Sequence, residues 1–223
     1  MTGPPLVRCE RVERIYRRGG SAVLALREVS CSVEPGDRIA IMGRSGSGKS
    51  TLGHLMAGLD EPTTGRVDWP ALGSRSELRP LGISVVFQSP SLRPELDVIE
   101  NVALPLELAG TPAAEARGLA LEALAALDLA GLAEQLPEEL SGGQSQRVAV
   151  ARVLATGPAL VIADEPTGQL DHSTASRMLA VLEAACDSLG ATLLLMTHDE
   201  RVAARYPRRW QLVDGVLHRG EQP

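Results

Sequence analysis

A glycine-rich stretch at residues 43–51, GRSGSGKST, carries the residue types that bind a phosphate chain. It follows the apolar segment RIAIM and matches the spacing G-x-x-x-x-G-K-[ST]. In such a loop, backbone N–H groups and the start of the next helix surround phosphate oxygens. We expect Lys49 to neutralise the terminal phosphates and Ser50 to ligate Mg²⁺. The alternative is a strand-to-helix turn that binds nothing. The predicted contacts are Gly43, Arg44, Ser45, Gly46, Ser47, Gly48, Lys49, Ser50 and Thr51.

Two adjacent carboxylates end the apolar segment LVIADEP. Asp164 is expected at the C-terminal end of a buried strand, where α/β folds bind ligands, and it could hold Mg²⁺ through water. Glu165 could orient an attacking water or accept its proton. Asp-Glu-Pro after an apolar strand is also an ordinary loop start, so the functional interpretation depends on the phosphate loop (residues 43–51).

The stretch LSGGQSQRVAVARVLA (residues 140–155) opens a predicted helix with two glycines. Ser141 and Gln144 fit a capping box. Gly142 and Gly143 are not explained by it, since each glycine in a helix costs about 0.5–1 kcal/mol relative to alanine. We interpret them as opening the helix N-terminus to a second phosphate group. Because the chain has no second G-K-[ST] motif, that group would be bound on another molecule, which implies a dimer.

The composition limits the other functions that the chain could have. The 223 residues have a net charge of -6, which argues against a broad nucleic-acid-binding surface. Three distant cysteines fit neither a disulfide framework nor a zinc site and favour a reducing cytosol. The longest apolar run is far shorter than the ~20 residues of a membrane-spanning helix. Any membrane span would have to come from another chain.

The order of predicted elements indicates an α/β fold in one domain, residues 1–223. Short β-branched segments near the N-terminus predict an antiparallel β portion, and the apolar segments around residues 160 and 194 predict buried strands of a parallel sheet. Helical spacing after Thr111, with Thr111 as cap and Pro112 at the first helical position, predicts a helix. Another helix is expected near 173–188, and the Asp-Gly pair near the C-terminus predicts a hairpin. We expect an α/β core at 1–88 and 146–223 and a helical subdomain at 89–145.

The phosphate loop, LSGGQ and ADEP, in this order, resemble the nucleotide-binding subunit of an ATP-binding cassette (ABC) transporter. The resemblance implies a P-loop NTPase fold with a RecA-like parallel-sheet core and an inserted helical subdomain. It covers nearly the whole chain. Single residues occupy the positions of the family's adenine-stacking aromatic, Q-loop glutamine, D-loop aspartate and switch histidine, namely Tyr16, Gln88, Asp171 and His198.

The resemblance also implies how these residues would work. Two subunits would enclose two ATP molecules, with the phosphate loop of one facing LSGGQ of the other. Glu165 would be the general base and His198 would contact the γ-phosphate. Gln88 would contact Mg²⁺ and the attacking water. The residues expected to bind ATP from the partner's side are Ser141, Gly142, Gly143 and Gln144.

The segments DEPTG and LRPELDVIENVALPLELAG further resemble the branch of macrolide-exporter (MacB), lipoprotein-releasing (LolD) and cell-division (FtsE) ATPases. This implies an ATPase on the cytoplasmic face of the cell membrane that drives export or extracytoplasmic work by a separate permease, as a homodimer or a heterodimer. The alternative is an FtsE-like regulator of a cell-wall complex. Two departures from the branch are Gln169, where Asn is common, and a shorter stretch from residue 65 to residue 88.

Overall fold

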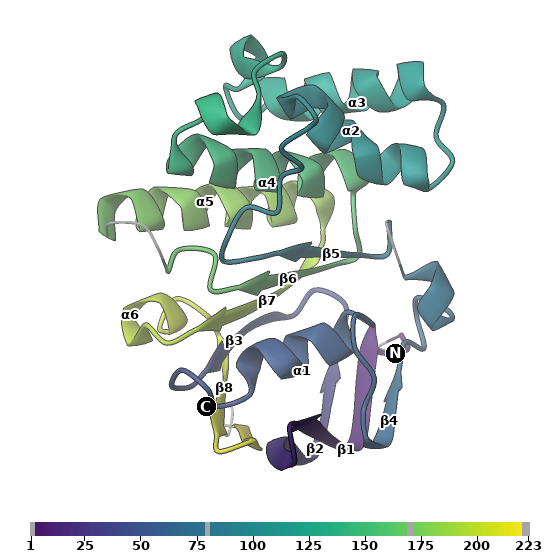
Figure 1. The fold of residues 1–223 in the computed structure, drawn as a ribbon, viewed down its shortest axis with the longest axis vertical. Helices are drawn as coiled ribbons and strands as arrows, with labels where there is room; N and C mark the ends of the chain where they lie inside the picture. Colours follow the sequence, from purple (N-terminus) through teal and green to yellow (C-terminus); the bar gives the residue numbers. More distant parts are fainter. Residues whose placement is uncertain (1–2, 79–80, 169–171, 220–223) are drawn as a thin grey trace. The chain divides into compact units, whose positions relative to one another are not determined.

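The computed structural model describes residues 3–78, 81–168 and 172–219, which form two compact units (Figure 1). The first unit contains the residues up to 78, residues 162–165 and the residues from 192 onward. The second contains residues 79–161 and 166–191. The predicted boundaries of the helical subdomain, 89 and 145, stay a prediction.

An antiparallel sheet lies in the first unit. It consists of β1 (Val7–Arg18), β2 (Ser21–Val33) and β4 (Thr64–Asp68), in the order β2-β1-β4. Gly19 and Gly20 connect β1 to β2, and both have positive φ, which a tight hairpin turn requires. This sheet is the antiparallel β portion predicted near the N-terminus.

The same unit holds a second group of strands around a buried centre. The strand β3 (Arg38–Met42) pairs in parallel with β7 (Thr192–Thr197) on one side and with β8 (Arg208–Val213) on the other. Beyond β7 lies the end of β6 (Leu160–Asp164), and beyond β8 lies β9 (Val216–Arg219). All residues of β6 and β7 are buried, as the apolar runs predict.

Short connections complete the first unit. The helix α1 (Lys49–Met56) begins within the last residues of the phosphate loop, and α6 (Glu200–Ala203) follows β7. The predicted Asp-Gly hairpin joins β8 to β9, with Asp214 and Gly215 both at positive φ. Between β4 and Leu78 the one helical element described is the 3-10 turn η1 (Arg75–Glu77), consistent with the shortened stretch noted in the sequence.

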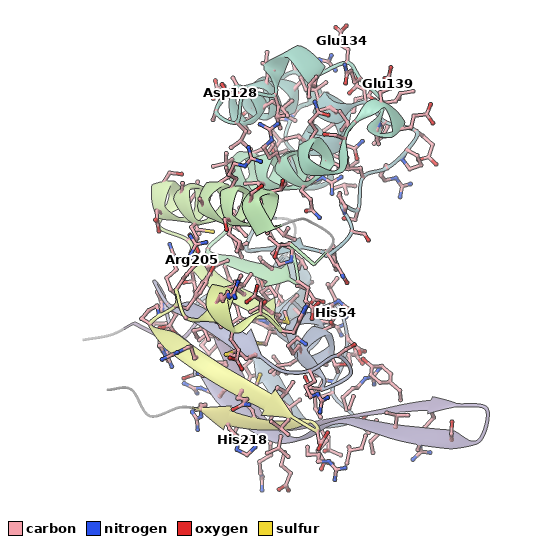
Figure 2. The ribbon with its side chains drawn as sticks, turned by 90° about the vertical axis from the view of Figure 1, so that its left-hand side faces the viewer. His54, Asp128, Glu134, Glu139, Arg205 and His218 are labelled. Carbon is pink, nitrogen blue, oxygen red and sulfur yellow. The ribbon has the colours of Figure 1, made fainter. Side chains whose placement is uncertain are left out.

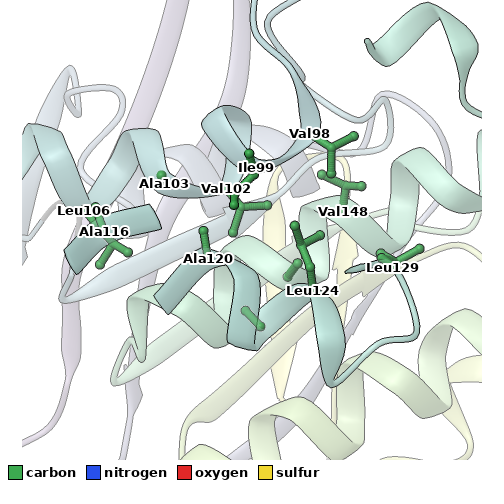
Figure 3. Packing of buried hydrophobic residues seen from close by; sticks show 12 residues of the cluster. Val98, Ile99, Val102, Ala103, Leu106, Ala116, Ala120, Leu124, Leu129 and Val148 are labelled. Atoms are coloured by element: carbon green, nitrogen blue, oxygen red, sulfur yellow. The ribbon is translucent and has the colours of Figure 1, made fainter. Parts of the chain in front are cut away.

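The described residues of the second unit contain β5 (Ile83–Val86), the first residues of β6, and four α-helices. The helices are α2 (Val98–Leu108), α3 (Ala113–Ala125), α4 (Gly142–Thr156) and α5 (His172–Leu189). Two 3-10 turns, η2 (Ala130–Leu132) and η3 (Pro137–Glu139), lie between α3 and α4. Figure 3 shows apolar side chains of α2, α3 and α4 packed together, among them Val102, Leu124 and Val148.

The prediction that Thr111 caps the next helix is wrong. The helix α3 begins at Ala113, its N-cap is Pro112, and no side chain caps it. The Thr111 N–H donates to the carbonyl oxygen of Leu106 at 3.0 Å, so Thr111 belongs to the C-terminal turn of α2. The helix predicted near 173–188 is confirmed as α5. In the described part of the chain, no helix is long and apolar enough to cross a bilayer.

The apolar cluster of the second unit generates a stability prediction. Leu124 is fully buried in it, whereas Leu121, one turn away on α3, is 45% exposed. Replacing Leu124 with Ala should lower the free energy of unfolding by about 2–5 kcal/mol, because the cavity adds to the lost transfer energy. The matched variant Leu121→Ala should change it by about 0.5 kcal/mol or less. Urea unfolding measures both, and equal effects would contradict the assigned packing.

Candidate nucleotide-binding site

The phosphate loop follows β3 and runs into the first turn of α1, and the backbone around Gly43 and Gly48 requires glycine at both positions. A Cβ on Gly43 would lie 2.4 Å from Oγ of Ser47 and 2.5 Å from the carbonyl oxygen of Leu212. Gly48 has φ +104°, and a Cβ there would lie 2.5 Å from the carbonyl oxygen of Ala25. Any larger residue would therefore displace the main chain and disturb the loop.

Lys49 is folded back over this loop. Its Nζ donates to the carbonyl oxygens of Gly43 at 2.8 Å and Arg44 at 3.2 Å, and its side chain is 4% exposed. Nζ also lies 3.1 Å from Oε1 of Glu165. A buried ammonium needs a compensating charge. The end of β6 supplies that charge here.

The two carboxylates at the end of β6, Asp164 within the strand and Glu165 directly after it, differ in their surroundings. Asp164 is 9% exposed, and its Oδ1 finds no hydrogen-bond partner among the described residues. Glu165 has φ +46°, and its N–H donates to the carbonyl oxygen of Met196 in β7 at 3.0 Å. This left-handed turn directs the Glu165 carboxylate at Lys49 and also at His198, whose Nδ1 lies 3.1 Å from Oε2. The structure thus brings the predicted Glu165, Lys49 and His198 together.

Other predicted residues of the first unit lie as follows. Tyr16 is on β1, 39% exposed, and its hydroxyl donates to Asp60. Ser47 is buried, and its Oγ, like Oδ1 of Asp164, has no partner among the described residues. Once a ligand is bound, the Ser47 hydroxyl can donate or accept a hydrogen bond, and the Asp164 carboxylate oxygen can accept one. The more exposed loop residues are Arg44, Ser45, Gly46 and Ser50, and Thr51 is half-buried.

The LSGGQ segment lies in the second unit, at the start of α4. The predicted capping box is present: Ser141 N–H donates to Oε1 of Gln144 at 2.7 Å, and Gln144 N–H donates to Oγ of Ser141 at 3.3 Å. The N–H groups of Gly142 and Gly143 take no part in it. At the first two helical positions, such groups have no partner within the helix.

The two glycines of this segment differ from those of the phosphate loop. A Cβ on Gly142 would meet nothing within 4 Å, and a Cβ on Gly143 would meet only the methyl group of Thr174, at an ordinary 3.8 Å. Neither has positive φ. Nothing in the described chain therefore requires glycine at these positions.

Gln88, after β5, is held by a residue that sequence reasoning missed. Its carbonyl oxygen accepts a hydrogen bond from Nε2 of Gln146 at 2.8 Å. Gln146 is on α4 and 3% exposed, and its Oε1 has no partner among the described residues. A polar residue on the buried face of a helix was the available signal, because buried amides nearly always hold a specific partner.

The segment after Gln88 is held in a similar way. The Arg152 guanidinium donates to the carbonyl oxygen of Ser91 at 3.0 Å and to Oδ1 of Asn101 at 2.8 Å. Asn101 Oδ1 also accepts from the N–H of Arg93 at 2.7 Å. Burial lowers the pKa of Arg152 to about 10, so the group stays charged at neutral pH. Two side chains thus fix the backbone of residues 91–93.

The predicted Asp171, together with Gln169, lies outside the described residues. Of the remaining predicted residues, the first unit contains Tyr16, the phosphate loop, the β6 carboxylates and His198. The second contains Gln88 and the LSGGQ segment.

Comparison with known proteins decides the family. The sequence profile described as "ABC transporter" matches residues 26–168. The chain belongs to the ABC transporter family. The chain is 40% identical over 222 residues to the "Lipoprotein-releasing system ATP-binding protein LolD" of Alcanivorax borkumensis, covering 96% of this chain and 97% of that protein. It is 41% identical over 219 residues to the LolD protein of Legionella pneumophila, covering 95% and 96%.

Solved structures agree with this assignment. The "Dimeric Structure of MJ0796, a Bacterial ABC Transporter Cassette" matches with a TM-score of 0.85 and 36% identity, covering 97% of this chain and 98% of the other. The same cassette in "a post-hydrolysis state" bound to ADP and Pi matches equally well. This chain is therefore an ATP-binding and ATP-hydrolysing subunit of an ABC transporter, with the predicted P-loop NTPase fold. The resemblance noted in the sequence is confirmed.

The contrast between the two sets of glycines can be tested without nucleotide. Gly142→Ala should leave the free energy of unfolding of this ABC ATPase unchanged or raise it by up to about 1 kcal/mol, because alanine is the better helix former and has room there. Gly48→Ala should destabilise the fold, because of its positive φ and the close carbonyl of Ala25. Thermal unfolding in the absence of ligand measures both, and a loss of stability in Gly142→Ala would show that the glycine serves the fold.

Proposed function

We propose that two copies of this chain enclose ATP between the phosphate loop of one and Ser141, Gly142 and Gly143 of the other, and that this closure drives a separate membrane permease. The observation that carries the proposal is the open space at both glycines, since a close approach from outside the chain accounts for the missing side chains. One chain carries both halves of such a site, so a two-fold symmetric homodimer forms two complete sites.

Hydrolysis is assigned to Glu165. In the structure, its carboxylate balances the charge of Lys49. A γ-phosphate bound in the loop offers Lys49 another negative partner, and Glu165 is then free to orient a water and accept its proton. His198 is adjacent to Glu165 and can donate a hydrogen bond to the γ-phosphate. Tyr16 is assigned to the adenine ring, and Asp171, which lies outside the described residues, is assigned to nucleotide binding.

The residues of the site also fit Mg²⁺. Oδ1 of Asp164 is a buried oxygen with no partner among the described residues, and Ser50 supplies a hydroxyl in the first turn of α1. Hard oxygen ligands of this kind suit Mg²⁺, with Asp164 acting through water. The amide oxygen of Gln88, the third ligand expected from the sequence, belongs to the second unit, and its contact with the ion stays a prediction. When bound, the ion would neutralise the charge that develops on the phosphates.

The partner is assigned from the relatives. Both relatives compared above are named as ATP-binding proteins of a lipoprotein-releasing system. We assign this chain to a transporter of the same exporter branch, bound to its permease at the cytoplasmic face of the membrane. Purifying the tagged chain from its own membranes tests this assignment. A co-purified permease with a large extracytoplasmic region that raises ATPase activity supports it, whereas a cell-division or wall-hydrolase complex in its place would overturn it.

The role of Glu165 predicts the behaviour of Glu165→Gln. The variant should bind ATP no more weakly and stay dimeric with ATP, while turnover falls by about 10²- to 10⁴-fold because the proton acceptor is gone. Phosphate release at saturating ATP measures this. Glu200→Gln, at an exposed carboxylate on α6, is the control and should hydrolyse normally. Unchanged turnover in Glu165→Gln would remove Glu165 from the role.

The dimer predicts a separate effect of Gly143→Leu. Binding of ATP to the monomer should be retained, while ATP-driven dimerisation and hydrolysis are lost because the side chain keeps the phosphates from the helix N-terminus. Light scattering with and without ATP, together with nucleotide titration, measures the two properties. Gly118→Leu is the matched control. Gly118 is also a helical glycine, and a Cβ on it would meet no other atom within 4 Å. Loss of monomer ATP binding in Gly143→Leu would contradict the assignment.

A further inference from the structure

Three side chains of the first unit form a cluster around the ring of Tyr16. Arg14 and Tyr16 are two residues apart on β1, so they share a face of the strand. The guanidinium carbon of Arg14 lies over the Tyr16 ring, 4.6 Å from its centroid. Asp60 accepts two hydrogen bonds from Arg14, at 2.7 Å and 3.0 Å, and one from the Tyr16 hydroxyl at 2.8 Å. The tyrosine is thereby held at its hydroxyl and covered on one face.

Asp60 is ionised at neutral pH in this arrangement. Burial alone would raise its pKa, but the pKa is lowered by hydrogen bonds from the Glu61 N–H, from Tyr16 and from Arg14, and by the Arg14 charge. A charged acceptor strengthens all three of these side-chain hydrogen bonds. The fork of Arg14 and the carboxylate form a bidentate pair, the ion-pair geometry that fixes orientation best.

The cluster is also connected to the phosphate loop. The helix α1 begins at Lys49, within that loop, and the N–H groups of Leu59 and Asp60 donate to the carbonyl oxygen of His54 in α1, at 2.8 Å and 3.3 Å. Figure 2 labels His54 on α1 and shows the β1–β2 hairpin that carries Tyr16. The position of the tyrosine ring is therefore set relative to the start of α1.

Other hydrogen bonds already link β1 to the residues between α1 and β4. The N–H of Ile15 donates to Oγ1 of Thr63 at 3.0 Å, and the N–H of Thr63 donates to the carbonyl oxygen of Glu13 at 2.8 Å. These bonds already hold β1 to the chain before β4. A partly exposed ion pair adds about 0–1 kcal/mol to stability. The contacts of Arg14 and Asp60 are thus better explained by the ring that both of them touch.

We infer that Arg14 and Asp60 are positioning residues for the base of the bound nucleotide: Arg14 covers one face of the Tyr16 ring and Asp60 holds its hydroxyl, so that the other face stacks on the purine. The inference rests on the proposed function, in which Tyr16 contacts adenine. A tyrosine ring that is already held in place loses little entropy when a base stacks on it, which raises the affinity for the nucleotide. This gain comes from the contact with the base and not from the phosphates. The phosphate contacts are made by other residues.

Binding of ADP and of inorganic pyrophosphate to the full chain, measured by calorimetry with Mg²⁺, tests this inference. Arg14→Ala and Asp60→Ala should each weaken ADP binding by about 3- to 10-fold, the size of a lost cation–π or aromatic contact. Pyrophosphate binding should not change. Arg14→Lys should recover only part of the loss, because an ammonium lacks the planar fork. Arg17→Ala, at an exposed residue of the same strand, is the control.

A double-mutant cycle separates the assignment of Tyr16 to adenine from the assignment of Arg14 and Asp60 as residues that position Tyr16. If Arg14 acts through the tyrosine, Arg14→Ala should have no further effect on ADP affinity in a Tyr16→Ala background. Equal losses for ADP and pyrophosphate, or full additivity in the cycle, would overturn the inference. If Tyr16→Ala binds ADP normally, the assignment of Tyr16 to adenine fails. If Tyr16→Ala weakens ADP binding but the Arg14 and Asp60 variants do not, only the inference fails.

Discussion

The buried ammonium of Lys49 is the constraint on which the nucleotide site depends. Removing a positive charge from water is costly, so Nζ must be surrounded by acceptors and balanced by a negative charge. Two carbonyl oxygens of the phosphate loop and the carboxylate of Glu165 meet this need. The loop carbonyls precede the body of α1 in the sequence, and the Glu165 carboxylate comes long after it. Both groups can reach Nζ only if β3 and β6 end near the start of α1. The parallel strands of the first unit deliver their C-terminal ends to that point, the usual position of sites in α/β folds.

Glycine occupies two pairs of positions in the site for different physical reasons. The pairs are Gly43 with Gly48 and Gly142 with Gly143. In the phosphate loop, glycine is imposed by neighbouring atoms of the same chain, at separations too short for any Cβ. At the start of α4, the surrounding space is open and the backbone is helical. A glycine that the fold does not require, at a position where it lowers helix stability, is explained by what must approach it from outside. The sequence already suggested an approach from outside at Gly142 and Gly143, and the atomic positions add that the chain itself leaves room for a side chain there.

Local patterns predicted much of the fold and the site. Glycine spacing, apolar runs and the Asp-Gly pair located the phosphate loop, the buried strands β6 and β7 and the C-terminal hairpin, since each pattern is set by residues adjacent in sequence. Thr111 was misassigned because its N–H completes α2, a competition that propensity does not reveal. Gln146, Arg14 and Asp60 were missed for another reason. Their partners lie 44 to 58 residues away, and no spacing rule connects them.

The segment that follows Gln88 shows how such distant contacts organise the second unit. Its backbone carbonyls are held by long side chains of α4, namely Gln146 at residue 88 and Arg152 at residue 91. Gln146 follows the LSGGQ segment by two residues, so the start of α4 and Gln88 are joined by one side chain. Because the partner atoms are main-chain oxygens, this link constrains the path of the segment whatever side chains it carries. Hydrogen bonds contained within one compact unit therefore connect residues 88–91 to the helix that presents Gly142 and Gly143.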